Sequence, residues 1–195
     1  ARTQQPKKLL DFPYNSNPPD ESWFNWYLLP ILLDGKVFAL VSMSLDVTDR
    51  HRTEHALLES EEKYRGLFNN VQESVAVYRL VYDENGEAVD RIFVDANPKA
   101  IGEMGYQKRE DIIGKPYSEV VLQHFPGDQK SIDLHLRSLA EVVRSGKPIT
   151  YDTHFGDRAY ITTQYLVSRD LVASSSMEIT RRKLAEEALR ESEMQ

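Results

Sequence analysis

One short junction, in which a strand leads directly into a charged helix, occurs twice in this 195-residue chain. Asp46-Val47-Thr48 aligns with Glu178-Ile179-Thr180, 132 residues further on. The match continues without gaps along both helices, where Ala56-Leu57 and Glu59-Ser60-Glu61 align with Ala188-Leu189 and Glu191-Ser192-Glu193. Two copies of one junction indicate tandem units, each ending in a connecting helix.

The junction residues suggest how each helix is fixed to its sheet. Asp46 and Thr48, and likewise Glu178 and Thr180, offer side-chain oxygens to the first free amides of the helix that follows. A helix fixed in this way moves with the sheet edge. We therefore interpret these four residues as a signal junction.

The repeat sets the expected organisation of the chain. Two apolar runs before the first junction, separated by Asp34-Gly35, predict a β-hairpin. Residues 1–47 are therefore read as the C-terminal strands of a preceding unit, whose front half is missing from this chain. Residues 48–73 are read as a connecting helix, 74–180 as one complete domain and 181–195 as an exit helix.

Within the central domain, period-two and helical patterns alternate. Asn97-Pro98 predicts a helix start, because Asn caps free amides and Pro suits the first helical position. Gly146 is expected to end a longer helix over residues 131–145. Strands are expected at 74–82, 91–96, 149–155, 159–167 and 171–179, and short helices at 98–104, 108–112 and 118–122.

Composition excludes several classes of function. The formal net charge of -7 and pI of about 5.3 argue against nucleic-acid binding and against adhesion to anionic lipid. The chain has no cysteine, which excludes disulfides, thiolate metal sites and thiol catalysis. We see no signal peptide and no apolar run of about 20 residues, so we expect a cytoplasmic segment of a parent that could be anchored elsewhere.

Five segments recur in a characteristic order and spacing: Glu61–Phe68, Val94–Ala100, Ile112–Lys115, Ser145–Pro148 and Glu178–Lys183. Upstream, Asp46–Arg50 repeats the last of them. Together they resemble a PAS sensory domain with the C-terminal part of an upstream PAS domain attached. Two departures stand out: Glu178 replaces the usual Asp, and Ala159-Tyr160 stands where the family often has Trp.

The resemblance implies an α+β fold, with a five-stranded antiparallel sheet of order 2-1-5-4-3, short helices on one face and flanking signalling helices. It also implies a small-molecule pocket between helices and sheet, and homodimerisation through the flanking helices. Such domains sit upstream of histidine kinase or diguanylate cyclase domains. The expected function is a non-catalytic sensory and dimerisation module that relays its state through the helix after Thr180.

Ten residues, most of them apolar, are candidates for lining the pocket, although the same residues could simply form the core. Strand alternation predicts that Gln164 faces away from Thr163 and Tyr165. The candidates are Val75, Val77, Phe93, Ile101, Ile113, Leu139, Val143, Ile161, Thr163 and Tyr165.

A cofactor is not expected, but one alternative involves haem. His135 lies on the helix that carries the haem ligand in oxygen-sensing PAS domains; flanked by Leu134 and Leu136, it is expected to be a surface or half-buried structural residue. Flavin photochemistry through a reactive Cys is excluded. His51 and His55, at i and i+4, could bind a metal or accept a phosphoryl group, but are read as solvated helix residues.

Catalysis is not expected, because no triad, phosphate loop or metal-ligand spacing is visible. The remaining alternative is a ligand-free assembly module. It would dimerise through an apolar stripe of Leu57, Tyr64 and Phe68 on the connecting helix.

Overall fold

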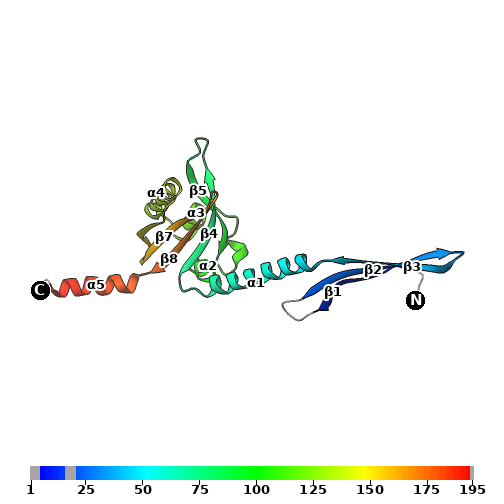
Figure 1. Cartoon of the computed structure of the whole chain (residues 1–195). Coiled ribbons are helices and arrows are strands. Elements are labelled where there is room, and N and C mark those ends of the chain that lie inside the picture. Colours follow the sequence, from blue (N-terminus) through cyan, green and yellow to red (C-terminus); the bar gives the residue numbers. More distant parts are fainter. Residues whose placement is uncertain (1–4, 16–20, 194–195) are drawn as a thin grey trace. The chain divides into compact units, whose positions relative to one another are not determined.

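A computed structural model describes residues 5–15 and 21–193 (Figure 1). The chain divides into two compact units, residues 1–65 and 66–195, and we describe each by itself. The boundary falls within helix α1 (Thr48–Asn70). This helix begins where the connecting helix was predicted to begin and ends three residues before the predicted end at residue 73.

The first unit is an antiparallel meander of β1 (Lys7–Asn15), β2 (Ser22–Leu33) and β3 (Lys36–Asp46), in that order. The predicted hairpin is confirmed. Asp34 and Gly35 both have positive φ, 48° and 73°, which is the conformation that two-residue hairpin turns need.

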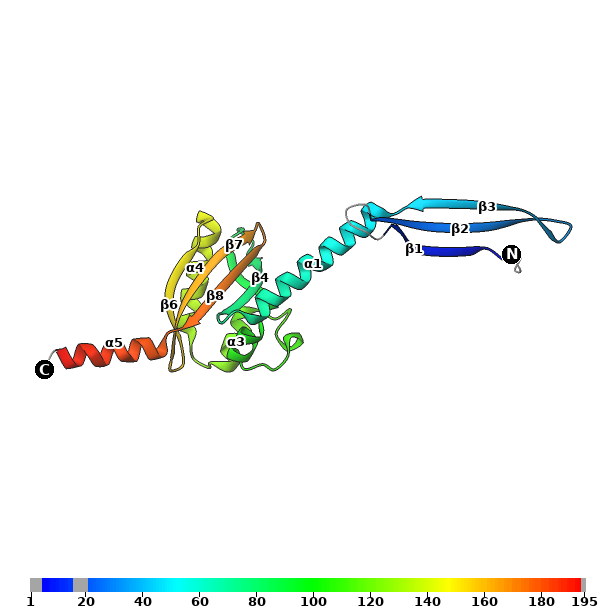
Figure 2. The ribbon, with the colours of Figure 1, turned by 60° about the horizontal axis from the view of Figure 1, so that its bottom comes forward.

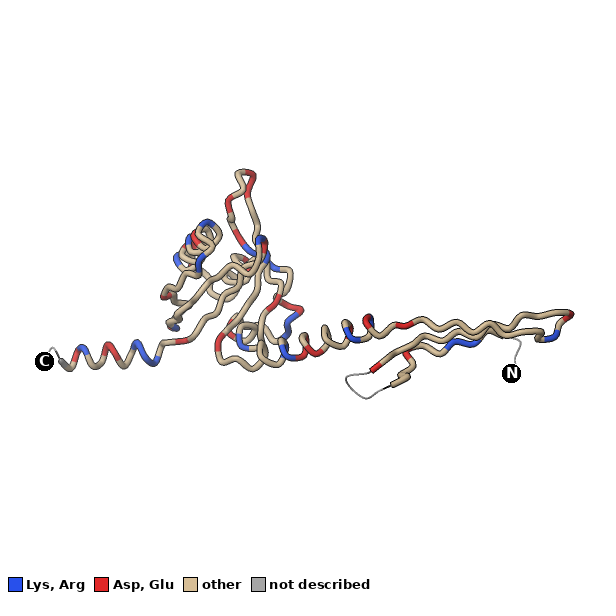
Figure 3. The backbone as a smooth tube through the Cα atoms, in the orientation of Figure 1, with Lys and Arg blue, Asp and Glu red and all other residues tan. Residues whose placement is uncertain are grey.

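The strands of this unit are apolar but not buried. β2 carries no charged side chain, and β3 carries them only at its two ends, as Figure 3 shows. Side chains on both faces are nevertheless exposed, for example Ile31 at 47% and Phe38 at 72%. Among the described residues of this unit, only Val47 and Thr48 are buried. Three strands alone do not enclose a core.

The second unit contains a five-stranded antiparallel sheet in the order β5-β4-β8-β7-β6. In sequence order this is 2-1-5-4-3, so the predicted fold class is confirmed. The strands are β4 (Ser74–Tyr82), β5 (Ala88–Ala96), β6 (Ile149–Phe155), β7 (Arg158–Ser168) and β8 (Leu171–Glu178).

Helices cover one face of this sheet, and Figure 2 shows α4 lying along β6 and β7. The core between the two layers includes Ile112, Val120, Leu139 and Val172, none of which is exposed. The helices are α2 (Pro98–Glu103), the 3-10 turn η1 (Arg109–Asp111), α3 (Tyr117–His124), α4 (Gln129–Ser145) and the exit helix α5 (Thr180–Glu193).

Asn97 caps α2 as predicted and also ties it to the sheet. Its Oδ1 accepts hydrogen bonds from the amides of Ala100 and Val75, at 2.9 and 3.1 Å. Its Nδ2 donates to the carbonyl of Glu73. At the other end of the helical segment, Gly146 ends α4 in the left-handed conformation (φ 65°). No helix in the described ranges has the length and apolar character needed to cross a membrane.

Candidate functional site

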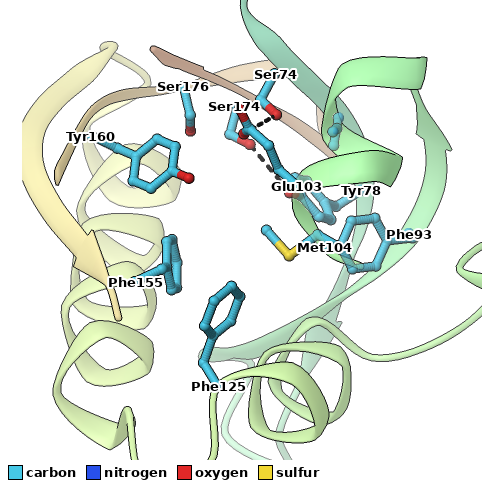
Figure 4. A pocket seen from close by; sticks show the side chains of 12 residues that line it. Ser74, Tyr78, Phe93, Glu103, Met104, Phe125, Phe155, Tyr160, Ser174 and Ser176 are labelled. Carbon is cyan, nitrogen blue, oxygen red and sulfur yellow. Dashed lines mark hydrogen bonds between the residues drawn. The ribbon is translucent and has the colours of Figure 1, made fainter. Parts of the chain in front are cut away.

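A small cavity lies between the sheet and the helices of the second unit (Figure 4). Its volume is about 30 Å³, which is room for one or two water molecules. Aromatic rings and methyl groups form most of the wall, and hydroxyls and one carboxylate interrupt it. The lining residues are Ser74, Ala76, Tyr78, Phe93, Ala100, Glu103, Met104, Phe125, Phe155, Tyr160, Ser174 and Ser176.

Two hydrogen bonds join polar groups of the cavity wall to one another, and Figure 4 draws them as dashed lines. Ser74 Oγ donates to Glu103 Oε2 at 2.6 Å, and Tyr78 Oη lies 3.2 Å from Ser174 Oγ. Glu103 Oε1 lies 3.1 Å from Lys99 Nζ, which balances the carboxylate charge. An apolar wall with a few convergent polar groups is typical of small-molecule sites.

Behind Tyr78 lies a buried cation, Arg91 on β5. Only 1% of Arg91 is exposed, and its Cζ lies 4.3 Å from the ring centroid of Tyr78 and 4.1 Å from that of Tyr117. Tyr117 Oη interacts electrostatically with the guanidinium, yet the two groups do not meet the geometry of a hydrogen bond. The residue was not singled out from the sequence. A signal existed, because alternation places Arg91 on the same face of β5 as Phe93.

His135 adjoins this cation and is buried, with 3% exposed. Its Nδ1 lies 2.8 Å from the carbonyl oxygen of Ser131, so Nδ1–H is the donor. Burial, together with the charge of Arg91, lowers the pKa of His135 to about 3, while the Ser131 hydrogen bond opposes the shift. His135 is therefore neutral near pH 7.

The prediction that His135 is a surface or half-buried residue was wrong. The buried stripe of α4 runs through Ile132, His135, Leu139 and Val142, whereas the sequence reading had placed Leu136 on it. The rings of Tyr117, Tyr151 and Phe155 have centroids 5.2 to 5.4 Å from the imidazole. Haem would have to displace these rings to reach His135.

Gln164 faces away from Thr163 and Tyr165 as predicted, but it lies on the inward face of β7, where those two residues had been expected. It is fully buried, and its Nε2 donates to Tyr151 Oη and lies 3.4 Å from the carbonyl of His135. Burial raises the pKa of Tyr151 to about 12, with Arg91 and the Gln164 hydrogen bond opposing, so this hydroxyl is neutral. Gln164 does alternate with Thr163 and Tyr165, but it is Gln164 that faces the helices.

The same error of phase affects five pocket candidates. On β4 the buried residues are Ala76, Tyr78 and Leu80, and on β7 they include Thr162 and Gln164. Arg79 is exposed and shares a face with Val77, so the sequence did contain a signal for β4. The residues that alternation places on the other face, all half-buried, are Val75, Val77, Ile161, Thr163 and Tyr165.

The other five candidates lie on the helix-covered side. Phe93 lines the cavity. Ile101 and Leu139 are buried in the core, and Ile113 and Val143 pack against it half-buried. Of the ten candidates, Phe93 is the one that the cavity brings together with the polar groups.

The two junctions share one hydrogen-bond pattern. Thr48 Oγ1 accepts from the amide of Trp23 at 3.0 Å, and Thr180 Oγ1 accepts from the amide of Ala159 at 3.0 Å. The amide of Val47 donates to the carbonyl of Trp23, and that of Ile179 donates to the carbonyl of Ala159. Each threonine thus joins the first turn of its helix to the neighbouring strand. The prediction that these hydroxyls accept from free helix amides was wrong, since they accept from strand amides.

The junctions differ in the carboxylate. Asp46 Oδ1 accepts from both the amide and the hydroxyl of Thr48, at 2.9 and 2.6 Å, and these bonds lower the pKa of Asp46. Glu178 Oε1 accepts from the hydroxyl of Thr180 at 2.9 Å. The longer side chain of Glu178 therefore replaces two short bonds with one.

The proposed dimer stripe on α1 is only partly accessible. Leu57 is 68% and Tyr64 43% exposed, but Phe68 is 7% exposed and is unavailable to a partner helix. His51 stacks on Trp23, with ring centroids 3.7 Å apart. Across the described ranges, no group of three or more potential His, Asp or Glu ligands could hold a metal ion.

No protein-family model and no curated protein matches this sequence. Solved structures do resemble it. A domain of an HTR-like protein from Haloarcula marismortui ATCC 43049 has 19% identity and a TM-score of 0.42, covering 55% of this chain and 98% of that one. A domain of the sensory box sensor histidine kinase/response regulator from Geobacter sulfurreducens has 14% identity and a TM-score of 0.41, covering 62% and 95%.

A third structure, an RNA-binding Light-Oxygen-Voltage receptor, has 10% identity and a TM-score of 0.46, covering 98% of this chain and 82% of that one. Identities this low do not transfer a ligand or a partner to this chain. The strand order of the second unit, rather than the degree of similarity, defines its fold.

Proposed function

We propose that this PAS-type domain is a non-catalytic sensory module, which binds a small molecule between its helices and its sheet and relays the bound state through α5. The observation that carries this proposal is the position of Tyr160 and Ala159. Tyr160 lines the cavity, and the amide of the adjacent Ala159 donates to Thr180 Oγ1 at the start of α5.

The relay follows from this adjacency. A ligand that moves the Tyr160 ring also moves the backbone of β7 that holds Thr180. A ligand that binds one packing of β7 more tightly than another shifts the population toward that packing. The exit helix then changes its orientation with the strand.

Residues 1–47 are proposed to be the C-terminal strands of a second unit of the same kind. The matched hydrogen bonds of Thr48 and Thr180 support this. The antiparallel meander β1-β2-β3 also corresponds to the meander β6-β7-β8 of the second unit. In the second unit, β8 pairs with β4 as well as β7. Within the described residues β3 pairs only with β2. We propose that an upstream segment of the parent supplies the missing strand and the helices that cover the apolar face.

The parent protein is proposed to be a multidomain signalling protein of the sensor histidine kinase or diguanylate cyclase type. Homodimerisation through the flanking helices belongs to this proposal. On α1, the exposed Leu57 and Leu58, at 68% and 61%, fit that contact better than the buried Phe68.

Native mass spectrometry of the purified chain tests the proposal against a ligand-free assembly module. A sensory module is expected to carry a small-molecule adduct that is lost on denaturation. If the chain is dimeric and carries no small-molecule adduct, either as purified from cells or after incubation with a metabolite mixture, the assembly module would be favoured. An absorption spectrum of protein purified with haem supplied tests the haem alternative, because haem bound through His135 would give a Soret band.

A further inference from the structure

Arg91 is a buried cation without a hydrogen-bond acceptor. Its Nε, Nη1 and Nη2 all lack a partner among the described residues. The rings of Tyr78 and Tyr117 attract the guanidinium through their faces, but a ring face does not satisfy five N–H donors. A guanidinium stays protonated in proteins, so burial does not remove its charge. Buried charges are normally paired.

The surrounding groups do not supply a counter-charge. Tyr117, Tyr151 and His135 are neutral near pH 7, because burial opposes the ionisation of each. The carboxylates on the same strand are engaged elsewhere, Asp95 with Arg109 at 2.8 Å and Asp90 with Ser118 at 2.6 Å. Tyr117 Oη is itself a buried donor without a partner.

We propose that Arg91 anchors the carboxylate of a small organic acid bound in the domain interior, with Tyr117 Oη as a second donor. This inference rests on the proposed function and specifies its ligand class. A carboxylate matches the guanidinium fork in charge and geometry. The aromatic walls of the cavity, at Phe93, Phe125 and Phe155, suit an apolar body on the same molecule.

A carboxylate fits better than a phosphate dianion. Arg91 is the one buried Lys or Arg in the described part of the chain, so the site offers a single positive charge. A dianion would leave one buried charge without compensation.

Tyr78 lies between the cavity and the cation. Its ring lines the cavity and faces Arg91, and its hydroxyl is held by Ser174 on β8. At about 30 Å³ the cavity is too small for such an acid, so binding requires this ring to turn aside. That movement breaks the Tyr78–Ser174 hydrogen bond, enlarges the cavity and opens it to Arg91. Ligand entry therefore acts directly on β8, the strand that leads into α5.

Thermal unfolding of the whole chain with benzoate, and with its neutral counterpart benzamide, tests the inference. Benzoate is expected to raise the Tm of the wild type with increasing concentration, and benzamide to raise it much less. Arg91→Met is expected to abolish the benzoate shift and, without ligand, to have a Tm equal to or above that of the wild type, because it removes an unpaired buried charge. Arg79→Met, at an exposed position of the neighbouring strand, is the matched control and is expected to keep the shift.

Tyr117→Phe provides a second variant, should Arg91→Met not fold. It is expected to weaken benzoate binding by at least about tenfold, the lower end of the usual effect of one hydrogen bond to a charged group. Equal responses of wild type and Arg91→Met to benzoate, or none in the wild type, would overturn the acid assignment. Neutral molecules that bind both proteins would leave the sensory function standing, whereas absence of any small-molecule binding would remove both proposals.

Discussion

At the scale of single residues, the interior of the domain is defined by polar side chains held without charge around one cation. Arg91, His135 and Gln164 each lie in the layer between sheet and helices, and all three are at most 3% exposed. Sequence patterns treat such residues as polar and place them outside. The error on Gln164 has this cause, since its polarity reversed the inferred phase of β7. Hydrogen bonds offset the cost of burying His135 and Gln164, whereas the guanidinium of Arg91 has no hydrogen-bond acceptor among the described residues.

His135 gives a testable pH dependence. Its pKa is about 3 in the folded chain and close to 6.5 when unfolded, so the unfolded chain binds one more proton as the pH falls below 6.5. Folding stability is therefore lost toward acid pH. Between pH 7 and pH 5 this group is expected to lower the free energy of unfolding by about 2 kcal/mol. Denaturant unfolding at both pH values is the measurement. In His135→Phe, the fall in the free energy of unfolding between pH 7 and pH 5 is expected to be smaller than in the wild type by that amount.

His154→Gln is the control for this experiment, because His154 is exposed on β6. It is expected to retain the pH dependence of the wild type. An unchanged dependence in His135→Phe would show that His135 is protonated normally in the folded chain, contrary to its burial.

At the scale of elements, the repeated junction was recognised from sequence because each copy has a carboxylate and a threonine two residues apart. The bond between the threonine hydroxyl and the carboxylate is local, whereas the bond from each threonine to the neighbouring strand spans 25 residues at Thr48 and 21 at Thr180. The cavity could not be predicted from sequence in the same way. Its wall combines residues of all five strands with α2 and with the residues that follow α2 and α3, and strands with apolar residues on both faces leave the inward face ambiguous. On β4 the exposed Arg79 resolves the ambiguity, whereas β7 offers no comparable charge near its centre.

Exchanging the two carboxylates tests whether the exit helix is held less tightly than α1. Glu178→Asp is expected to add the amide bond that Asp46 makes to Thr48, and so to slow hydrogen exchange of the amides in the first turn of α5. Asp46→Glu is the reverse change and is expected to speed exchange at the start of α1. A cap bond of this kind is worth about 1 kcal/mol, or roughly a fivefold change in rate. Equal exchange in wild type and both variants would mean that carboxylate length does not control the junction.

At the scale of the whole molecule, the resemblance to PAS domains implied the strand order that the second unit has, and the internal repeat located the two junctions. The unit formed by residues 1–65 has apolar strands with no core of their own among the described residues. Composition alone would have treated β2 as a buried strand. No local pattern in these residues indicates that the strands of this unit are exposed. The individual strands and helices follow from local patterns, whereas burial depends on the complete set of packed elements.

The central claim is that the cavity and α5 are coupled through β7, and hydrogen exchange at the amide of Lys183 tests it most directly. This amide makes an early helical bond, to the carbonyl of Ile179. Ala100→Leu fills the cavity without a ligand, and Ala140→Leu makes the same change at a half-buried position of α4 that does not line it. We expect Ala100→Leu to change Lys183 exchange at least about threefold, with exchange in the core of β8 unaltered, and Ala140→Leu to leave both unchanged. Identical Lys183 exchange in all three proteins would contradict the coupling.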